Sequence, residues 1–287
     1  MPSGLEINIG ELSKPINTLV EKISNAAGIL YEPTRIKRKA NAEAEAKKTK
    51  IVMDLEIDDL QKRAMNRFLQ EETIKQHNIE NIVEKSFDKI NYDATPEDIE
   101  NDWIANFFDK SKFISDSEMQ ELWSEILAGE SNKPGTYSRR TIEQLSLLSK
   151  KDAELFRNLC KFSFKIDNEY HLLILNYTDE IYKNNGITFT NLMHLNHIGL
   201  ITFDTNNAFS VSNIETPILN YFGKCLNLSM KDNTELNIHL GSAFFTETGQ
   251  DLVDITNAQY NDEFYNFIIE FYKSKNIKVS ESPEIII

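Results

Sequence analysis

Residues 34–50 read Thr-Arg-Ile-Lys-Arg-Lys-Ala-Asn-Ala-Glu-Ala-Glu-Ala-Lys-Lys-Thr-Lys, and they open a stretch of chain, through about Ile90, that contains neither glycine nor proline. Alanine, lysine, arginine and glutamate are strong helix formers. Acidic residues also precede basic residues by four positions, which stabilises solvated helices; the pairs are Glu43/Lys47, Asp58/Lys62, Asp59/Arg63 and Glu71/Lys75. We therefore predict one long helix over residues 34–90, with His77-Asn78 as the candidate break point.

The apolar residues of this predicted helix do not form a single stripe. At about 100° per residue, they fall into two groups on different sides. The first group is Ile51, Leu55, Met65 and Leu69, and the second is Ile57, Leu60, Ala64 and Phe68. A helix with two apolar faces needs two neighbours, which favours a helical bundle or an oligomer.

The start of the predicted helix concentrates positive charge in an acidic protein. The chain has a formal net charge of −14, yet seven basic and only two acidic residues lie between Pro33 and Lys50. The basic residues are Arg35, Lys37, Arg38, Lys39, Lys47, Lys48 and Lys50. Lys37/Lys48 and Lys39/Lys50 each realign after eleven residues, and the two pairs lie about 200° apart, so the charge surrounds the helix.

This basic cluster allows several interpretations: a solvated helix face, or contact with phosphates, lipid headgroups or an acidic protein surface. A helix that tracks a nucleic-acid groove or lies on a membrane concentrates its charge on one side. The acidic remainder of the chain makes self-association attractive, because the basic end of one subunit can meet an acidic surface of another. Protein–protein assembly is therefore favoured, with membrane contact as the alternative.

Residues 12–30 have the pattern of an amphipathic helix. The apolar residues that share one face are Leu12, Ile16, Leu19, Val20, Ile23, Ala27 and Leu30. Pro15 is tolerated because it lies in the first turn, and Pro33 interrupts the helix. We expect this face to pack against the protein's own helices; the alternative is insertion into a membrane surface, with residues 12–50 engaging lipid.

Residues 95–163 are typical of a compact helical unit. Thr95-Pro96 predicts a helix start with proline at the first position. Ser115-Asp-Ser-Glu118 has the spacing of a capping box for a helix that ends at Gly129. Ser138 and Ser149 are expected to cap two further helices, through Leu147 and Lys161. The aromatic residues in this region stand at core-like spacings: Trp103, Phe107, Phe108, Trp123 and Phe156.

After residue 163 strand-like runs alternate with short helices. The expected strands are 171–177, 200–203, 209–211, 221–230 and 236–245; the expected helices are 190–198, a short one from Thr248, and 263–272. This order resembles a winged-helix-like α+β domain. No lysine or arginine occurs between Lys183 and Lys224, so the candidate recognition helix cannot neutralise phosphates. Nucleic-acid binding through this region is therefore not expected.

The predicted fold is mainly α with a C-terminal α+β part: a long N-terminal helix and helical bundle, followed by a winged-helix-like domain. The expected segments are 1–92 (oligomerisation or partner binding), 93–163 (compact helical domain) and 164–287 (winged-helix-like domain). No run of about 18 apolar residues occurs, and the N-terminus lacks the features of a signal peptide. We expect a cytoplasmic protein, either free or peripheral at the membrane, with Cys160 and Cys225 as buried free thiols.

Several segments resemble a bacterial family known as domain of unknown function 2806. They are Ser13-Lys-Pro15, Ala27-Gly-Ile-Leu-Tyr-Glu-Pro33, Arg35-Ile-Lys-Arg-Lys-Ala40, Asp102–Lys110, Asp116–Glu130 and Ser138–Phe156. The resemblance covers roughly residues 10–165 and implies no activity.

A likeness of layout to the abortive-infection alpha family runs further along the chain. It rests on four short segments: Glu121–Ala128, Leu148–Phe156, His194–Ile201 and Phe245–Gly249. This likeness implies a role in defence against phage.

Catalytic signatures are scarce. His194 and His197 stand three residues apart, but no cysteine or carboxylate motif of zinc-site spacing accompanies them. No phosphate-cradling glycine loop, nucleophile elbow or zinc-protease motif occurs. We therefore predict no catalytic residue, metal or cofactor, and we assign partner or anion binding to the basic cluster and to Arg139 and Arg140.

The favoured function is that of a non-enzymatic bacterial interaction or sensor protein that assembles through its N-terminal helices, as a homo-oligomer or with a protein partner. A role in phage defence is implied only by the likeness to the abortive-infection alpha family. The alternatives are a membrane-acting effector that uses residues 12–50 and an enzyme, such as a nuclease, with an unrecognised carboxylate site.

Overall fold

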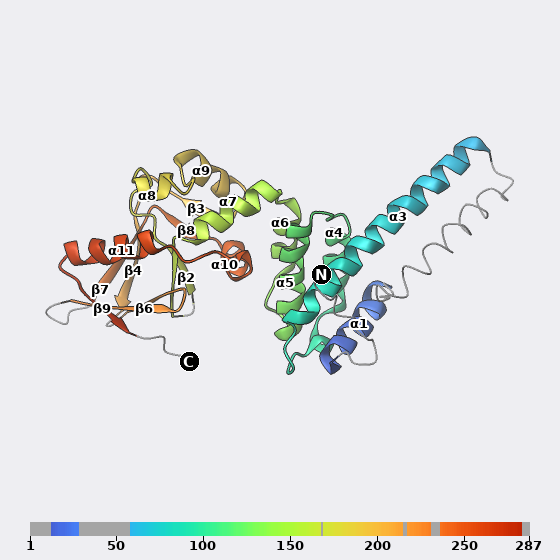
Figure 1. Cartoon of the computed structure of the whole chain (residues 1–287), viewed down its shortest axis with the longest axis horizontal. Coiled ribbons are helices and arrows are strands. Elements are labelled where there is room, and N and C mark those ends of the chain that lie inside the picture. The colour runs from blue at the N-terminus through green and yellow to red at the C-terminus, as the bar shows by residue number, and fades with distance from the viewer. Residues whose placement is uncertain (1–12, 29–57, 168, 215–216, 231–235, 283–287) are drawn as a thin grey trace, which may run out of the picture. The chain divides into compact units, whose positions relative to one another are not determined.

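A computed structural model describes residues 13–28, 58–167, 169–214, 217–230 and 236–282. The chain is mainly helical, with antiparallel sheet in its C-terminal half, and it divides into two compact units, Met1–Ser146 and Leu147–Ile287 (Figure 1). The expected boundary after residue 163 differs from this division, because the helix that precedes it belongs to the second unit.

The first unit is helical. Its described elements are α1 (Lys14–Ala27), α3 (Asp59–Ser86), the 3-10 turns η2 (Phe87–Lys89) and η3 (Pro96–Asp98), α4 (Asn101–Ser111), α5 (Ser117–Asn132) and α6 (Arg139–Leu147). The amphipathic prediction for α1 is confirmed: Pro15, Leu19 and Ile23 are buried, and Gly28 ends the helix with a left-handed φ of 67°. The helix packs against α4 and η3.

The long helix predicted over residues 34–90 does not run through Asp58, and its candidate break at His77-Asn78 does not occur. Asp58 is extended, with ψ of 168°, and its side chain accepts a hydrogen bond from the Gln61 N–H in a capping box. This cap starts a new helix at Asp59, and α3 then runs through His77-Asn78 without a break to Ser86. The residues before Asp58, from 29 to 57, lie outside the described part of the chain.

Three other predicted helix ends are displaced. Pro96 starts the short turn η3, and α4 begins only at Asn101. The cap of α5 is Asp116 instead of Ser115, because the Asp116 carboxylate accepts from the Glu118 and Met119 N–H groups at 3.0 and 3.1 Å. The same helix continues past Gly129 to Asn132.

The core of the first unit is aromatic. The ring centroids of Trp103 and Phe107 in α4 stack 5.1 Å apart, and Phe107 meets Trp123 of α5 edge-on at 5.2 Å. Ile82 of α3 is fully buried, and α3 and α5 are in contact along this end of α3. Trp103, Phe107, Phe108 and Trp123 are therefore core residues of this unit, as predicted, whereas the buried Phe156 belongs to the second unit.

The second unit combines sheet and helix. Its helical elements are α7 (Lys150–Cys160), α8 (Glu180–Lys183), α9 (Phe189–His197), α10 (Glu247–Val253), η4 (Asp254–Thr256) and α11 (Asp262–Ser274). Its strands are β1 (Ser163–Ile166), β2 (Glu169–Leu172), β3 (Ile201–Phe203), β4 (Phe209–Ile214), β5 (Ile218–Tyr221), β6 (Lys224–Ser229), β7 (Leu236–Gly241), β8 (Ala243–Phe245) and β9 (Lys278–Ser282).

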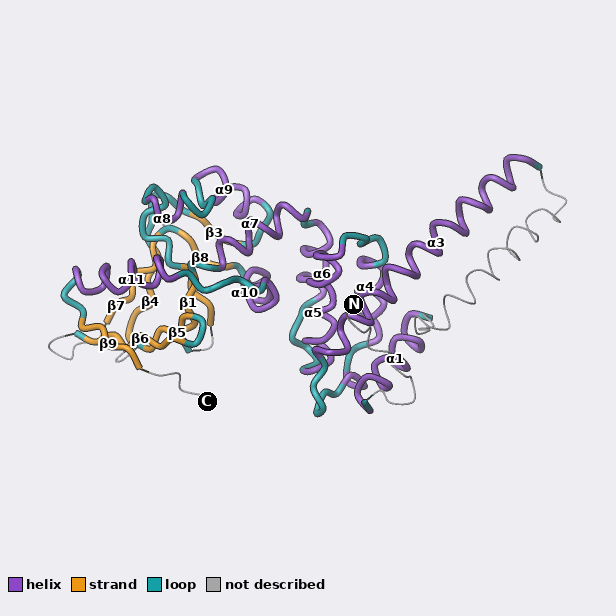
Figure 2. Tube along the Cα trace, in the orientation of Figure 1, coloured by secondary structure: helices purple, strands orange, loops and turns teal. Residues whose placement is uncertain are grey.

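The described strands form one larger sheet and two pairs (Figure 2). The larger sheet is antiparallel, in the order β2-β1-β5-β6-β9. The strands on either side of residues 204–208 pair with distant partners: β3 with β8, in the register Ile201↔Phe245, and β4 with β7. The sequence did not predict β9.

Two close contacts hold the second unit together. Phe264 of α11 packs edge-on against Phe162 at 4.8 Å between ring centroids, and it also meets Phe164 and Tyr221 of the larger sheet. At the start of α10, a Cβ at Gly249 would lie 2.1 Å from the Leu200 carbonyl oxygen, so only glycine fits there.

Candidate functional site

The N-terminal part of α3 extends beyond the helices that it packs against (Figure 1). None of the residues from 59 to 77 is buried, whereas Asn78, Ile79, Ile82, Val83 and Ser86 are. We call residues 59–77 the projecting half of α3. Its nineteen residues bury no side chain against the described part of the protein, and packing of an apolar face is what stabilises most protein helices.

The projecting half displays large apolar side chains. Leu60, Met65, Phe68 and Ile74 are 67%, 39%, 56% and 59% exposed. At about 100° per residue, Leu60 and Phe68 lie within about 80° of each other, on the side of the helix that carries the buried Ile82. The face that forms the core at one end of α3 therefore continues along the other end, where no described residue buries it.

Phe113, in the connection between α4 and α5, extends this surface to the base of the projecting half. It is 65% exposed, and the Lys75 Nζ lies 5.3 Å from the centroid of its ring. The side chain of Asn78 fixes this connection to α3 by donating to the Lys112 carbonyl at 3.0 Å. We call four of these exposed residues the α3 patch: Leu60, Phe68, Ile74 and Phe113. Met65 faces another side of the helix.

Ionic groups of the projecting half pair within the helix itself. The pairs are Arg63–Asp59 at 2.9 Å, Arg67–Glu71 at 3.5 Å and Lys75–Glu72 at 2.6 Å. The predicted pair Asp59/Arg63 is thus confirmed, whereas Lys75 pairs with Glu72 instead of Glu71, and Asp58 serves as the helix cap. The segment has four basic and three acidic residues, so it is close to neutral in a strongly acidic chain.

The residues predicted to bind partners or anions fall into two groups. The basic cluster lies outside the described residues; it consists of Arg35, Lys37, Arg38, Lys39, Lys47, Lys48 and Lys50. Arg139 and Arg140 are exposed in the first turn of α6. The structure therefore does not bring the two groups into one described site.

A buried carboxylate shapes the loop that leads to Arg139 and Arg140. Glu130 is 2% exposed, and it accepts hydrogen bonds from the Gly135 N–H at 2.7 Å and the Tyr137 N–H at 2.9 Å. Burial raises the pKa of Glu130, although these two backbone donors oppose the shift. The Trp103 indole then donates to the Tyr137 carbonyl at 2.7 Å, which ties the loop to the aromatic core.

Catalytic geometry is sparse in the described residues, where no group of three or more His, Cys, Asp or Glu side chains is placed to hold a metal ion. The His194 Nε2 lies 2.6 Å from an Asp152 carboxylate oxygen, and the other Asp152 oxygen accepts from the Ser149 hydroxyl at 2.7 Å. The carboxylate stands between the other two groups, so the imidazole cannot take a proton from the serine. Cys160 and Cys225 are buried free thiols, as predicted.

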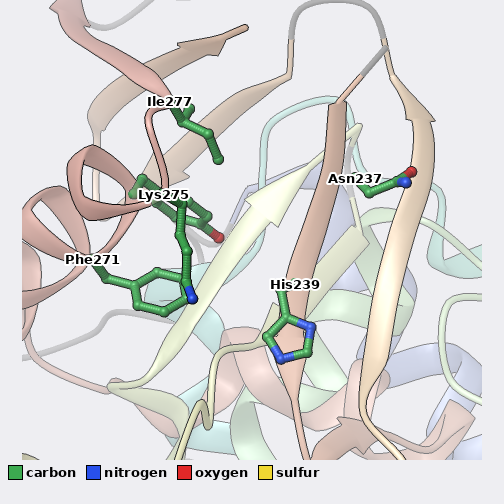
Figure 3. A pocket seen from close by; sticks show the side chains of 6 residues that line it. Asn237, His239, Phe271, Lys275 and Ile277 are labelled. Carbon is green, nitrogen blue, oxygen red and sulfur yellow. The ribbon is translucent and has the colours of Figure 1, made fainter.

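A hollow in the second unit was not predicted from the sequence. It has a volume of about 330 Å³ and lies between β7 and the C-terminal end of α11 (Figure 3). Its lining residues are Asn237, His239, Phe271, Tyr272, Lys275 and Ile277, and we call it the α11–β7 hollow. The alternation of Leu236, Ile238 and Leu240 with polar residues shows which side chains of β7 face outward, but it does not show which helix faces them.

Among the described helices, none has both the length and the apolar character needed to cross a bilayer.

Comparison with known proteins gives a family and no relative of known function. No curated protein and no solved structure matches the chain. A sequence model of the family described as "Protein of unknown function (DUF2806)" matches residues 62–269. The match begins later than the resemblance seen in the sequence and extends through most of the second unit. Because it covers well over half of the chain, the protein belongs to the DUF2806 family.

Proposed function

We propose that this protein is a non-enzymatic interaction protein that assembles with a second copy of itself through the α3 patch. The observation that carries the proposal is the exposure of three large apolar side chains, Leu60, Phe68 and Ile74, on one side of a helix segment that has no buried residue. Exposed apolar surface of this kind often marks a protein interaction site.

The size of the α3 patch suits a weak, concentration-dependent contact. With about 150–200 Å² for each large apolar side chain, its four partly exposed residues offer roughly 400 Å² per subunit. A symmetric pair would bury about 800 Å², which lies in the range of weak, transient contacts. At this size the costs of association and of side-chain ordering offset most of the gain from burial, so we expect a weak contact.

Charge is compatible with a second copy at this position. The whole chain carries a net charge of −14, so most pairs of surfaces repel each other. The projecting half is nearly neutral, and its ion pairs form along its own helix. Two copies can therefore approach along α3 without a local electrostatic penalty.

The membrane-acting alternative receives less support. Leu19 and Ile23 of α1 are buried within the first unit, and the Lys22 Nζ donates to the Glu97 carbonyl at 2.8 Å. A helix that is packed in this way must leave the unit before its apolar face can enter a lipid surface.

The second unit supports a winged-helix-like arrangement in a partner-contact or sensing role. Helices α8 and α9 are followed by β3, which pairs with β8, and residue Ile174 bridges to Gly241. The pair of strands β4 and β7 would then form an enlarged wing. By the layout likeness to the abortive-infection alpha family, we place this assembly in phage defence.

Sedimentation velocity of the full chain tests the assembly. We expect the wild-type protein to shift from monomer to dimer between about 1 and 100 μM, and Phe68→Ser/Ile74→Ser to remain monomeric. Tyr92→Ser is the matched control, because Tyr92 is 93% exposed in the same unit but lies outside the α3 patch. Tryptophan fluorescence checks that each variant is folded.

Two results would contradict the proposal: a wild-type protein that is monomeric at 100 μM, or a double variant that dimerises like the wild type. Phage plating on cells that carry the same variants tests the defence role separately. Loss of protection with Phe68→Ser/Ile74→Ser but not with Tyr92→Ser is the expected result.

A further inference from the structure

The α11–β7 hollow gathers polar side chains that the described part of the protein leaves without partners. Asn237 and His239 come from the outward face of β7, and Lys275 directly follows α11 (Figure 3). The contact recorded for the Lys275 ammonium group is with the ring of Phe271, at 5.7 Å from the centroid. None of the lining residues in the described chain is acidic, although the chain as a whole strongly is.

Tyr272 is the unusual member of this lining. It is 1% exposed, and its hydroxyl oxygen has no hydrogen-bond partner among the described residues. A buried hydroxyl without a partner costs about 1–3 kcal/mol. Burial also raises the pKa of Tyr272, so the phenol keeps its proton and remains a donor.

The helix end alone does not explain this arrangement. A cation such as Lys275 is favourable at the C-terminus of a helix, because the helix dipole is negative there. However, the last carbonyl groups of α11 already have partners: the Tyr272 carbonyl accepts from the Ile277 N–H at 3.1 Å, and the Lys273 carbonyl from the Asn276 N–H at 3.0 Å. The polar groups that lack hydrogen-bond partners here are therefore side chains, and a bound ligand would supply those partners.

We propose that the α11–β7 hollow binds a small organic anion, with its phosphate or carboxylate group held by Lys275, His239 and Asn237. The Tyr272 hydroxyl supplies a fourth donor, and the Phe271 ring and Ile277 contact the apolar part of the ligand. A volume of about 330 Å³ is at the small end of the range for ligand pockets, which limits the ligand to roughly one ring and its anionic group.

Isothermal titration of the full chain with phenyl phosphate, benzoate and the neutral analogue benzamide tests the proposal. We expect saturable binding of at least one anion and much weaker binding of benzamide. The comparison of phenyl phosphate with benzoate shows which anionic group the site prefers. Absence of saturable binding by both anions at millimolar concentration would overturn the proposal, as would equal binding of benzamide.

Single substitutions locate the site. Lys275→Gln should weaken anion binding about tenfold through loss of a charge-assisted hydrogen bond. Lys273→Gln is the matched control, because Lys273 is exposed on α11 and pairs with Glu270 at 3.0 Å. Binding that survives in Lys275→Gln, or that falls equally in Lys273→Gln, would place the anion elsewhere and overturn the proposal.

Tyr272→Phe separates a ligand contact from a structural role. We expect about two- to tenfold weaker binding. The unliganded protein should melt at the same or a higher temperature, because the variant removes a hydroxyl that lacks a partner. Unchanged affinity with a lowered melting temperature would show that the hydroxyl serves the fold, and would overturn its assignment to the ligand.

Discussion

Replacement of Glu130 should destabilise the first unit selectively. In Glu130→Ala, the N–H groups of Gly135 and Tyr137 lose their acceptor. Tyr137 is buried, so its orphaned N–H costs about 1–3 kcal/mol, whereas water can reach the exposed Gly135 and limits that cost to about 1 kcal/mol. We therefore expect a total loss of about 2–4 kcal/mol, a large part of the stability of an ordinary domain.

Glu130→Gln gives a graded version of the same change. The amide keeps one oxygen for one N–H group but turns an NH₂ group, itself a donor, towards the other. We expect a loss of about 1–2 kcal/mol. Glu97→Ala is the matched control, since Glu97 is exposed in η3 of the same unit. Its effect should stay within about 0.5 kcal/mol.

The tryptophans make the assay specific. The chain has two, Trp103 and Trp123, and both are buried in the first unit. Urea unfolding followed by tryptophan fluorescence therefore reports the free energy of unfolding of that unit. A free energy for Glu130→Ala that lies within about 0.5 kcal/mol of the Glu97→Ala value would refute the reasoning.

The same residue predicts a pH dependence. Burial raises the pKa of Glu130 above its ordinary value of 4.5, so the folded state binds this proton more tightly than the unfolded state. The stabilisation that the Glu130 proton gives to the folded state is fully present below the pKa of Glu130 in the unfolded state. It is lost as pH rises through the pKa of Glu130 in the folded state. The stability of wild type minus that of Glu130→Gln, a variant without this titration, should therefore decrease from pH 4 towards neutrality.

Two further predictions concern the second unit. Gly249→Ala should destabilise it by more than about 2 kcal/mol, because the new Cβ meets the backbone oxygen of Leu200; circular dichroism should show the loss, while the tryptophan transition stays unchanged. His194→Ala should cost less than about 1 kcal/mol, since His194 is half exposed. Burial raises the pKa of Asp152, but hydrogen bonds from Ser149 and His194 outweigh it and hold that pKa low, so their stabilisation is lost only as pH falls through the folded value. A loss well above about 1 kcal/mol for His194→Ala, measured by circular dichroism at neutral pH, would contradict this prediction.

Elements with local signals were predictable from the sequence. The amphipathic spacing of α1, the capping residue Ser149 of α7, and the glycine after α9 all act within a few residues of the helix that they define. The start of α3 was missed for a related reason. The alanine- and lysine-rich residues before it favour helix, but the side chain of Asp58 competes by capping a new helix at the next residue.

Strand pairing and the candidate sites could not be predicted in the same way. β3 pairs with β8, some forty positions along the chain, and no local pattern in either strand specifies this partner. The α3 patch was anticipated in part, because the second apolar group contained Leu60 and Phe68. The α11–β7 hollow depends on residues that are separated by more than thirty positions and look like ordinary surface in the sequence.

The uninterrupted course of α3 from Asp59 to Ser86 fixes the rotational phase of its free end relative to the core of the first unit. One residue inserted between positions 70 and 77 would turn Leu60 and Phe68 by about 100° and advance them by about 1.5 Å. Seven inserted residues would change the angle by only about 20°. Family members that keep the same contact should therefore differ in the length of the projecting half of α3 by about seven residues, added at one place or as one insertion of three residues and one of four.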